Sequence, residues 1–277
     1  MAFLFLQKTK NILKGHFSKQ SDTYARSRPK YPEELFQFLS SLCIEKKLVW
    51  DCATGNGQAA FSLANYFEKV IATDFSEQQI SNAFQKENIF YKVESAENSS
   101  LQNHSVDLIT VATAAHWFNI EKFYEEVNRV LKPNGILALW SYATCSINEE
   151  IDLLTRKFDL ETMNDYWPKA NDVNRKEKYK TLPFPYEKIA TPTFFATAEY
   201  NFEDLMNYLF SWSGVQEYIR QHNSNPIDFI KDNLHKLWGD ENQKRKISWK
   251  LHMLCGRNSP TRPPLKGGIS VHEKIIL

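Results

Sequence analysis

The stretch Leu48–Ala60, LVWDCATGNGQAA, is the most informative part of this sequence. Its apolar start, Leu48-Val49-Trp50, is typical of a strand that is buried on both faces, as in a parallel sheet. Gly55 and Gly57 follow in a short loop, where the missing side chains allow a backbone to approach a ligand closely. The residues after this loop, up to Phe67, place apolar side chains at helical spacing. Strand, glycine loop and helix in this order predict a nucleotide-type binding unit.

Two acidic residues, Asp51 and Asp74, narrow the choice of ligand. The segment Gly55–Ala60 also fits the dinucleotide pattern G-x-G-x-x-G/A. A dinucleotide would place its pyrophosphate at this loop, where the Asp51 carboxylate would repel it, whereas the sulfonium and ammonium of S-adenosylmethionine would be attracted. Asp74 ends the next apolar run, roughly 20 residues further on, at the spacing of an acid that accepts ribose hydroxyls. Both cofactors have that ribose, so Asp74 supports a nucleoside site without choosing between them.

Apolar runs alternate with helical patterns up to Trp140. Strands are predicted at 48–50, 70–73, 90–93, 106–112 and 136–140, and helices at 33–44, 77–87 and 121–131. This alternation predicts an α/β fold with a doubly wound, mostly parallel sheet. Further helices are predicted at 151–163, 203–220 and 226–239, with an edge strand at 194–200 and a half-buried, antiparallel closing strand at 247–255.

These elements divide the chain into five predicted parts. They are an N-terminal arm (1–32), a cofactor-binding Rossmann-like core (33–141), a substrate cap inserted before the last strands (142–192), the closing strands and helices of the core (193–257) and a disordered tail (258–277). The cap is predicted because the segment after Ser141 is too long for a simple connection. The tail is rich in proline and glycine.

Three motifs together resemble the class I S-adenosylmethionine-dependent methyltransferases. They are Asp51–Gly57, Asp74, and Arg129–Gly135 with the apolar strand that follows it. The resemblance covers residues 15 to 257. Three further stretches resemble the small-molecule branch that includes trans-aconitate methyltransferase: Tyr24–Pro32, Ala115–Phe118 and Ser211–Val215.

The resemblance implies a seven-stranded Rossmann-like methyltransferase fold, an N-terminal arm that acts as a lid, and S-adenosylmethionine as the methyl donor. The positions that match the family's cofactor contacts are Asp51, Ala53, Gly55, Gly57, Asp74, Phe75, Ser95, Ala96, Glu97, Ala112 and Ala115. Ala53 stands where the family usually has glycine, so that turn must accept a Cβ. Ser95 stands where the family usually has an acid. A plain loop is the alternative interpretation of Glu97.

His116 and Trp117 follow the predicted fourth strand, at the edge of a parallel sheet where ligands bind. His116 is the candidate catalytic residue, a base if the acceptor is a hydroxyl, and its alternative role is in packing. A carboxylate acceptor needs no base. Arg26 and Arg28 would orient a carboxylate by paired hydrogen bonds, unless they serve surface solvation or a salt bridge. The candidate acceptor-binding residues are Tyr24, Arg26, Arg28, Trp117 and Trp212.

Composition excludes several classes of protein. The 277 residues have a formal net charge of +1 without a basic block, which argues against nucleic-acid partners. The four cysteines are scattered, without the spacing of a zinc site or the density of a disulfide scaffold, so we expect no metal and a reducing, cytoplasmic setting. No apolar run has transmembrane length. The oligomeric state stays open.

Three functions therefore remain in competition. The first is a methyltransferase with a small-molecule acceptor. The second is a dinucleotide-dependent oxidoreductase, which would bind NADH and ignore S-adenosylhomocysteine. The third is a non-catalytic binding module that keeps the fold, a possibility raised by Ala53 and Ser95.

Overall fold

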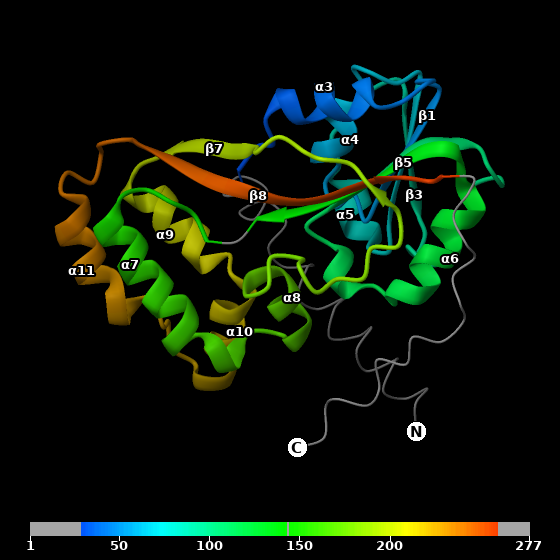
Figure 1. The fold of residues 1–277 in the computed structure, drawn as a ribbon. Coiled ribbons are helices and arrows are strands. Elements are labelled where there is room, and N and C mark those ends of the chain that lie inside the picture. The colour runs from blue at the N-terminus through cyan, green and yellow to red at the C-terminus, as the bar shows by residue number, and fades with distance from the viewer. Residues whose placement is uncertain (1–28, 143, 260–277) are drawn as a thin grey trace, which may run out of the picture.

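The computed structural model describes residues 29–142 and 144–259, and its central element is a mixed, mostly parallel sheet (Figure 1). Within these residues the sheet has eight strands in the order β3-β2-β1-β4-β5-β8-β6, and β7 pairs with β8. The strands are β1 Leu48–Cys52, β2 Lys69–Asp74, β3 Ile89–Val93, β4 Val106–Ala112, β5 Leu131–Tyr142, β6 Glu187–Lys188, β7 Phe195–Tyr200 and β8 Arg245–Arg257. Strands β1 to β5 run parallel, and β8 is antiparallel to β5, β6 and β7. The predicted fold class and the antiparallel closing strand are confirmed.

The sheet is buried on both faces because helices cover both, and successive residues of each strand point to opposite cores. In β1, Val49 belongs to the core beneath α3 (Glu33–Ser41) and α4 (Gln58–Leu63). Its neighbour Trp50 belongs to the core beneath α6 (Ile120–Val130). This arrangement leaves the ends of the parallel strands as the place where loops from different strands meet.

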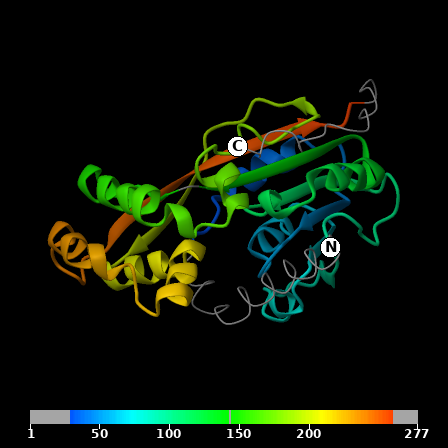
Figure 2. The same ribbon diagram turned by 90° about the horizontal axis from the view of Figure 1, so that it is seen from below.

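The remaining helices gather mostly at one end of the sheet (Figures 1 and 2). They are α7 Glu149–Lys157, α8 Asp172–Arg175, α9 Phe202–Phe210, α10 Ser213–His222 and α11 Asp228–Trp238. A short helix, α5 Glu77–Ser81, follows β2, and single turns form η1 Ala115–Trp117, η2 Phe158–Thr162, η3 Asn164–Tyr166 and η4 Lys169–Asn171. Since α7 packs on α11 and η3 packs on α10, the helical cap draws on both sides of β7. Helices from the predicted cap (142–192) thus pack against helices from the predicted closing part (193–257).

Several predicted elements differ in length. The eighth strand, β6, was not predicted, and it is a two-residue strand in which Glu187 and Lys188 pair with Arg257 and Gly256 at the end of β8. The predicted helix 77–87 ends at Ser81, because the Phe84 amide donates to the Asn56 carbonyl in the glycine loop instead of continuing the helix. The predicted helix 151–163 ends at Lys157 and continues as the wider turn η2.

The predicted helix 203–220 is two helices, α9 and α10, with a break at Ser211–Trp212. The Ser211 hydroxyl donates to the Tyr208 carbonyl at 2.6 Å, and Trp212 takes an extended ψ of 133°. A serine that bonds the preceding turn in this way competes with the regular helix. The break turns the start of α10 toward the cap.

In the parts of the chain described above, every helix is too short or too polar to cross a bilayer. Over the same residues, His, Cys, Asp and Glu side chains form no group of three or more that could hold a metal ion. The predicted arm residues Tyr24, Arg26 and Arg28 and most of the predicted tail lie outside the described residues.

Candidate functional site

The loop between β1 and α4 has an unusual backbone. Ala53, Gly55 and Gly57 all have positive φ, at 54°, 58° and 81°. Backbone hydrogen bonds hold the loop, from the Thr54 amide to the Thr73 carbonyl at 2.9 Å, from the Gly57 amide to the Thr54 carbonyl at 3.0 Å and from the Phe84 amide to the Asn56 carbonyl at 3.0 Å. Ala53 thus keeps the left-handed turn despite its Cβ, at a cost of about 1–2 kcal/mol. Alanine in place of the usual glycine therefore does not change the left-handed conformation of this turn.

The two glycines of the loop differ in what surrounds them. A Cβ added to Gly55 would meet no atom within 4 Å, so this face of the loop is open. A Cβ added to Gly57 would lie 2.1 Å from the Tyr91 hydroxyl oxygen, which donates to the Phe84 carbonyl at 2.5 Å. Gly57 therefore allows Tyr91 to support the loop from behind, while Gly55 offers its backbone to a ligand.

Asp74 joins the end of β2 to the glycine loop. One carboxylate oxygen accepts the Gly55 amide at 2.8 Å, and the other accepts the Ser76 amide at 2.9 Å. The side chain is buried, and this burial raises the pKa of Asp74, while the hydrogen bonds from the Ser76 and Gly55 amides oppose the rise. Each oxygen keeps a lone pair that is able to accept a ligand hydroxyl.

Asp51 corrects an expectation. The sequence argument placed its carboxylate where it attracts a cationic methyl donor, but its exposed fraction is 0%. Its oxygens accept the hydroxyls of Thr54 at 2.5 Å and Thr110 at 2.7 Å. Burial raises the pKa of Asp51 to about 6, against the opposing effect of the two threonine hydroxyls. The buried carboxylate thus links the loop, through Thr54, to β4, through Thr110.

The residues expected near the adenine lie beyond β2 and β3. Phe75 is 40% exposed, directly after Asp74. Ser95 is exposed and Ala96 is buried. The Glu97 carboxylate accepts the Asn119 amide at 3.0 Å and so ties this loop to the start of α6. Glu97 therefore has a structural role, which is to hold this loop against the start of α6.

The turn η1 brings His116 to the end of β4. Ala112 and His116 are partly buried, and Ala115 is 1% exposed. The His116 Nδ1 lies 3.3 Å from the hydroxyl of Tyr179, and its ring centre is 4.9 Å from that of Trp117. Burial lowers the pKa of His116 to about 4, so the imidazole is neutral at pH 7. Sequence reasoning missed Tyr179, because a residue in an irregular cap segment carries no periodic signal.

The described end of the arm lies on the same side. The Tyr31 amide donates to the Gln58 side chain at 3.2 Å, and Gln58 donates to the Pro29 carbonyl at 3.3 Å. The Tyr31 hydroxyl lies 3.3 Å from Thr113 Oγ1, just after β4. This segment therefore joins the start of α4 to the end of β4, the two places that flank the glycine loop.

Trp212 differs from its predicted role at an open acceptor site. It is 4% exposed and packs within 5.7 Å to 6.3 Å of the rings of Trp167, Tyr208 and Phe158. The break after α9 turns the indole into the cap, and these three rings bury it there. The structure therefore favours a packing role for Trp212.

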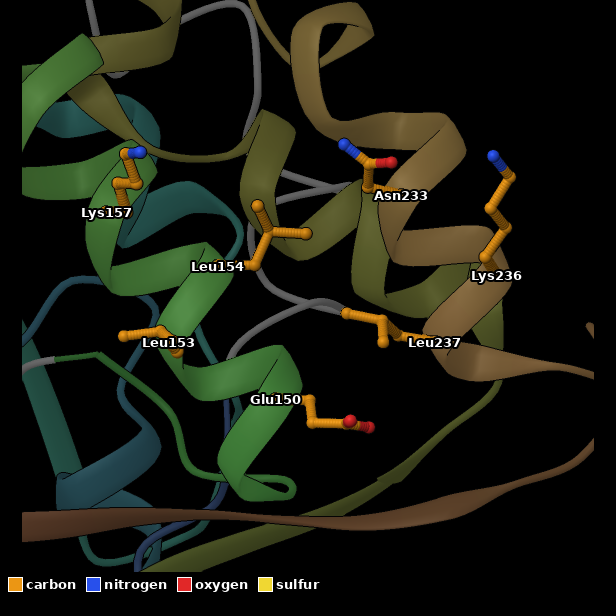
Figure 3. A pocket seen from close by; sticks show the side chains of 7 residues that line it. All are labelled: Glu150, Leu153, Leu154, Lys157, Asn233, Lys236 and Leu237. Carbon is orange, nitrogen blue, oxygen red and sulfur yellow. The ribbon is translucent and has the colours of Figure 1, made fainter.

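A separate groove of about 380 Å³ lies between α7 and α11 (Figure 3). Its apolar lining comes from Leu153, Leu154 and Leu237. None of the residues predicted for the site lines it. The strand ends, and not this groove, bring Gly55, Asp74 and His116 toward one edge of the sheet.

A mostly parallel sheet with a glycine loop after its first strand and an acid at the end of its second is a nucleotide-type binding arrangement, and the comparisons identify the family. Residues 50–139 match the family described as "Methyltransferase domain". A protein of Dictyostelium discoideum assigned as a methyltransferase is 37% identical over 249 residues, which cover 87% of this chain and 94% of that protein.

Two further relatives extend this match. CRG1 of Saccharomyces cerevisiae, assigned as an S-adenosylmethionine-dependent methyltransferase, is 25% identical over 263 residues, covering 89% of this chain and 84% of CRG1. A solved structure from Anaeromyxobacter dehalogenans, assigned as a type II methyltransferase, has a TM-score of 0.79 at 30% identity and covers 84% of this chain and 99% of its own. The chain belongs to the class I S-adenosylmethionine-dependent methyltransferases.

Proposed function

We propose that the protein binds S-adenosylmethionine at the glycine loop and transfers its methyl group to a small-molecule carboxylate. The match to methyltransferase relatives supports S-adenosylmethionine over a dinucleotide, and the open face of Gly55 beside the Asp74 carboxylate supports the glycine loop as its site. A neutral nucleoside with two ribose hydroxyls suits these groups, because each Asp74 oxygen has acceptor capacity left. Gly55 would hold the amino-acid part by its backbone, and Asp74 the ribose.

The methyl transfer requires the protein mainly to position the donor and the acceptor. S-adenosylmethionine supplies an already activated methyl group, which leaves by in-line displacement. The residues around η1 and the loop have to align the acceptor and exclude water. Gly55 and Asp74 position the donor side, while Trp117 and the cap residue Tyr179 close the acceptor side next to His116.

The state of His116 favours a carboxylate over a hydroxyl as the acceptor. A hydroxyl must lose a proton as it is methylated, and the best base for this has a pKa near 7. The pKa of His116 is lowered to about 4 by burial, so that its neutral imidazole is a poor proton acceptor. A carboxylate is already an anion and needs no base. His116 would then position the acceptor by a hydrogen bond.

The proposal is tested by calorimetry on the full chain. S-adenosylhomocysteine is expected to bind with micromolar affinity, and an excess of NADH is expected to leave that affinity unchanged. NADH binding without binding of S-adenosylhomocysteine would instead identify a dinucleotide-dependent enzyme. A product assay with small carboxylic acids then measures methyl esters. Cofactor binding with turnover of alcohols but not acids would identify a hydroxyl acceptor, and cofactor binding without turnover of any acceptor in a broad panel would favour a non-catalytic module.

The buried His116 also predicts a pH dependence of stability. Its folded-state pKa of about 4 lies below the value of about 6.5 for an exposed histidine. Between these values only the unfolded chain binds the proton, so stability falls as the pH falls from about 6.5 toward 4. Between pH 7 and pH 5, the free energy of unfolding measured with urea should fall by about 1–2 kcal/mol less in His116→Gln than in the wild type.

His252, whose pKa is also lowered to about 4, contributes to the same trend in both proteins and cancels in this comparison. Equal losses in the wild type and in His116→Gln would show that His116 is exposed to solvent.

A further inference from the structure

Tyr179 lies in an unusual turn that follows the cap helix α8. Lys178 and Tyr179 both have positive φ, at 55° and 61°, a conformation that bulky residues rarely adopt. The Tyr179 amide donates to the Val173 carbonyl at 2.8 Å, and the Lys178 amide donates to the Asn174 carbonyl at 3.1 Å. The turn directs the Tyr179 ring inward, where it is 1% exposed and its centre lies 6.3 Å from that of His116. Strained backbone of this kind is concentrated at functional sites.

The Tyr179 hydroxyl is surrounded by hydrogen-bond donors. Burial raises the pKa of Tyr179, and hydrogen bonds from three donors to its oxygen oppose the rise. The donors are the amides of Ala115 and His116 and the hydroxyl of Ser141. The two amides belong to the first residues of η1, where N–H groups have no partner within the helix. These donors are enough to occupy both lone pairs of the phenol oxygen.

This environment fixes the direction of the hydrogen bond between Tyr179 and His116. Because the phenol oxygen already accepts, its own proton is the one to be donated, and His116 Nδ1 lies within reach at 3.3 Å. The buried imidazole is neutral, so one of its nitrogens donates and the other accepts. If Nδ1 accepts from Tyr179, the imidazole proton is on Nε2. Tyr179 thus sets the tautomer of His116.

The second ring nitrogen, Nε2, is open to a ligand. Over the described residues, Nε2 has no hydrogen-bond partner and is not one of the buried polar atoms that lack one. It therefore faces solvent or a group outside the described residues. His116 is partly buried and follows β4, at the edge where open α/β sheets bind their ligands. The Nε2–H group is thus a hydrogen-bond donor at the proposed acceptor site.

A donor at Nε2 distinguishes between acceptor types. A carboxylate only accepts hydrogen bonds, and its charge strengthens the bond that it accepts from an N–H group. A hydroxyl that is methylated has to lose its proton, which requires an unprotonated nitrogen in front of it. In the tautomer that Tyr179 imposes, that nitrogen is Nδ1, and the Tyr179 hydroxyl already occupies it. The geometry therefore matches an anionic oxygen.

We propose that Tyr179 is a positioning residue for methyl transfer, because it keeps His116 Nδ1 as an acceptor so that Nε2–H holds one oxygen of the acceptor carboxylate. The other oxygen attacks the methyl carbon of the donor. The new O–C bond forms as the S–C bond breaks, the sulfur keeps the electron pair, and no proton moves. This inference rests on the proposed function, since it assigns the group that holds its acceptor.

The test uses Tyr179→Phe, which removes only the hydroxyl, and Tyr186→Phe as the matched control. Tyr186 is also buried, and its hydroxyl donates to Asn128 Oδ1 at 2.9 Å. Nitrogen-15 NMR of the full chain, labelled at histidine, shows which ring nitrogen is protonated, and His116→Gln assigns the signal. The wild type should have its proton on Nε2. A proton on Nδ1 overturns the inference, even if Tyr179→Phe does not fold.

The pKa of His116, followed in the same NMR experiment, should rise by about 0.5 to 1 in Tyr179→Phe. A hydroxyl that donates to Nδ1 stabilises only the neutral ring, so its loss favours protonation. Tyr186→Phe should leave this pKa unchanged. A fall in the pKa of His116 in Tyr179→Phe would mean that the tyrosine accepts from Nδ1, and an unchanged pKa would mean that the two groups do not interact.

Kinetics separate this inference from the proposed function. Acetic, benzoic and succinic acids are assayed for methyl esters, after calorimetry with S-adenosylhomocysteine. If the wild type fails to bind S-adenosylhomocysteine or to esterify any acid, the proposed function is wrong. If it forms an ester, Tyr179→Phe should lower kcat/KM about tenfold, mainly through KM, with unchanged affinity for S-adenosylhomocysteine. Equal kinetics in Tyr179→Phe and Tyr186→Phe would overturn the positioning role alone.

Discussion

Replacing Asp74 with alanine is expected to weaken the binding of S-adenosylhomocysteine at least about 100-fold. The Asp74 carboxylate accepts the amides of Gly55 and Ser76 and is the group proposed to hold the ribose. Hydrogen bonds to a charged group contribute about 1.5–3 kcal/mol each, and the loss of about 3 kcal/mol in binding corresponds to roughly 100-fold. Titration calorimetry measures the change directly.

Asp152 provides a matched control for this substitution. Its carboxylate also accepts one backbone amide, from Ile147 at 2.7 Å, and one hydroxyl, from Ser146 at 2.6 Å, but it lies at the start of α7. Asp152→Ala should leave the affinity for S-adenosylhomocysteine unchanged. Asp74→Asn, which keeps one acceptor oxygen, should fall between the wild type and Asp74→Ala. Wild-type affinity in Asp74→Ala would place the cofactor elsewhere.

Replacing Gly57 with alanine is expected to lower the free energy of unfolding by about 2–4 kcal/mol and to abolish cofactor binding. The new Cβ would lie 2.1 Å from the Tyr91 hydroxyl oxygen, at a φ of 81° that alanine seldom adopts. Tyr91 would have to move and release the carbonyl of Phe84, the residue whose amide ties the segment after α5 to the loop by donating to the Asn56 carbonyl. Urea denaturation and calorimetry read out the two effects.

Two companion variants separate the clash from the backbone strain. Gly55→Ala has a similar positive φ but open space around the Cβ, so its stability loss should be only about 1–2 kcal/mol, while the Cβ obstructs the cofactor. In a Tyr91→Phe background the hydroxyl is absent, and Gly57→Ala should cost less than in the wild type. Strictly additive losses for Gly57→Ala and Tyr91→Phe would show that the two residues do not meet.

Asp51 shows what can and cannot be inferred from a single stretch of sequence. Its position at the end of β1 was predicted, and the family it was used to support is confirmed by the comparisons. The sequence argument did not include its burial, since the carboxylate is enclosed and accepts the hydroxyls of Thr54 and Thr110. Thr54 is a near neighbour, but Thr110 comes from another strand. A spacing rule on one stretch of chain contains no information on that second partner.

The sequence by itself determined the alternating strands and helices of the parallel core, the glycine loop and the acids at the ends of β1 and β2. Apolar periodicity and the φ freedom of glycine act within a few residues, so they can be recognised in the sequence without knowledge of the fold. Only the tertiary structure decided that Tyr91 backs Gly57, that Tyr179 reaches His116 and that Asn171 faces Ser213. These pairs join residues far apart in the chain, and their hydrogen bonds and burial exist only when the sheet and the cap have packed together.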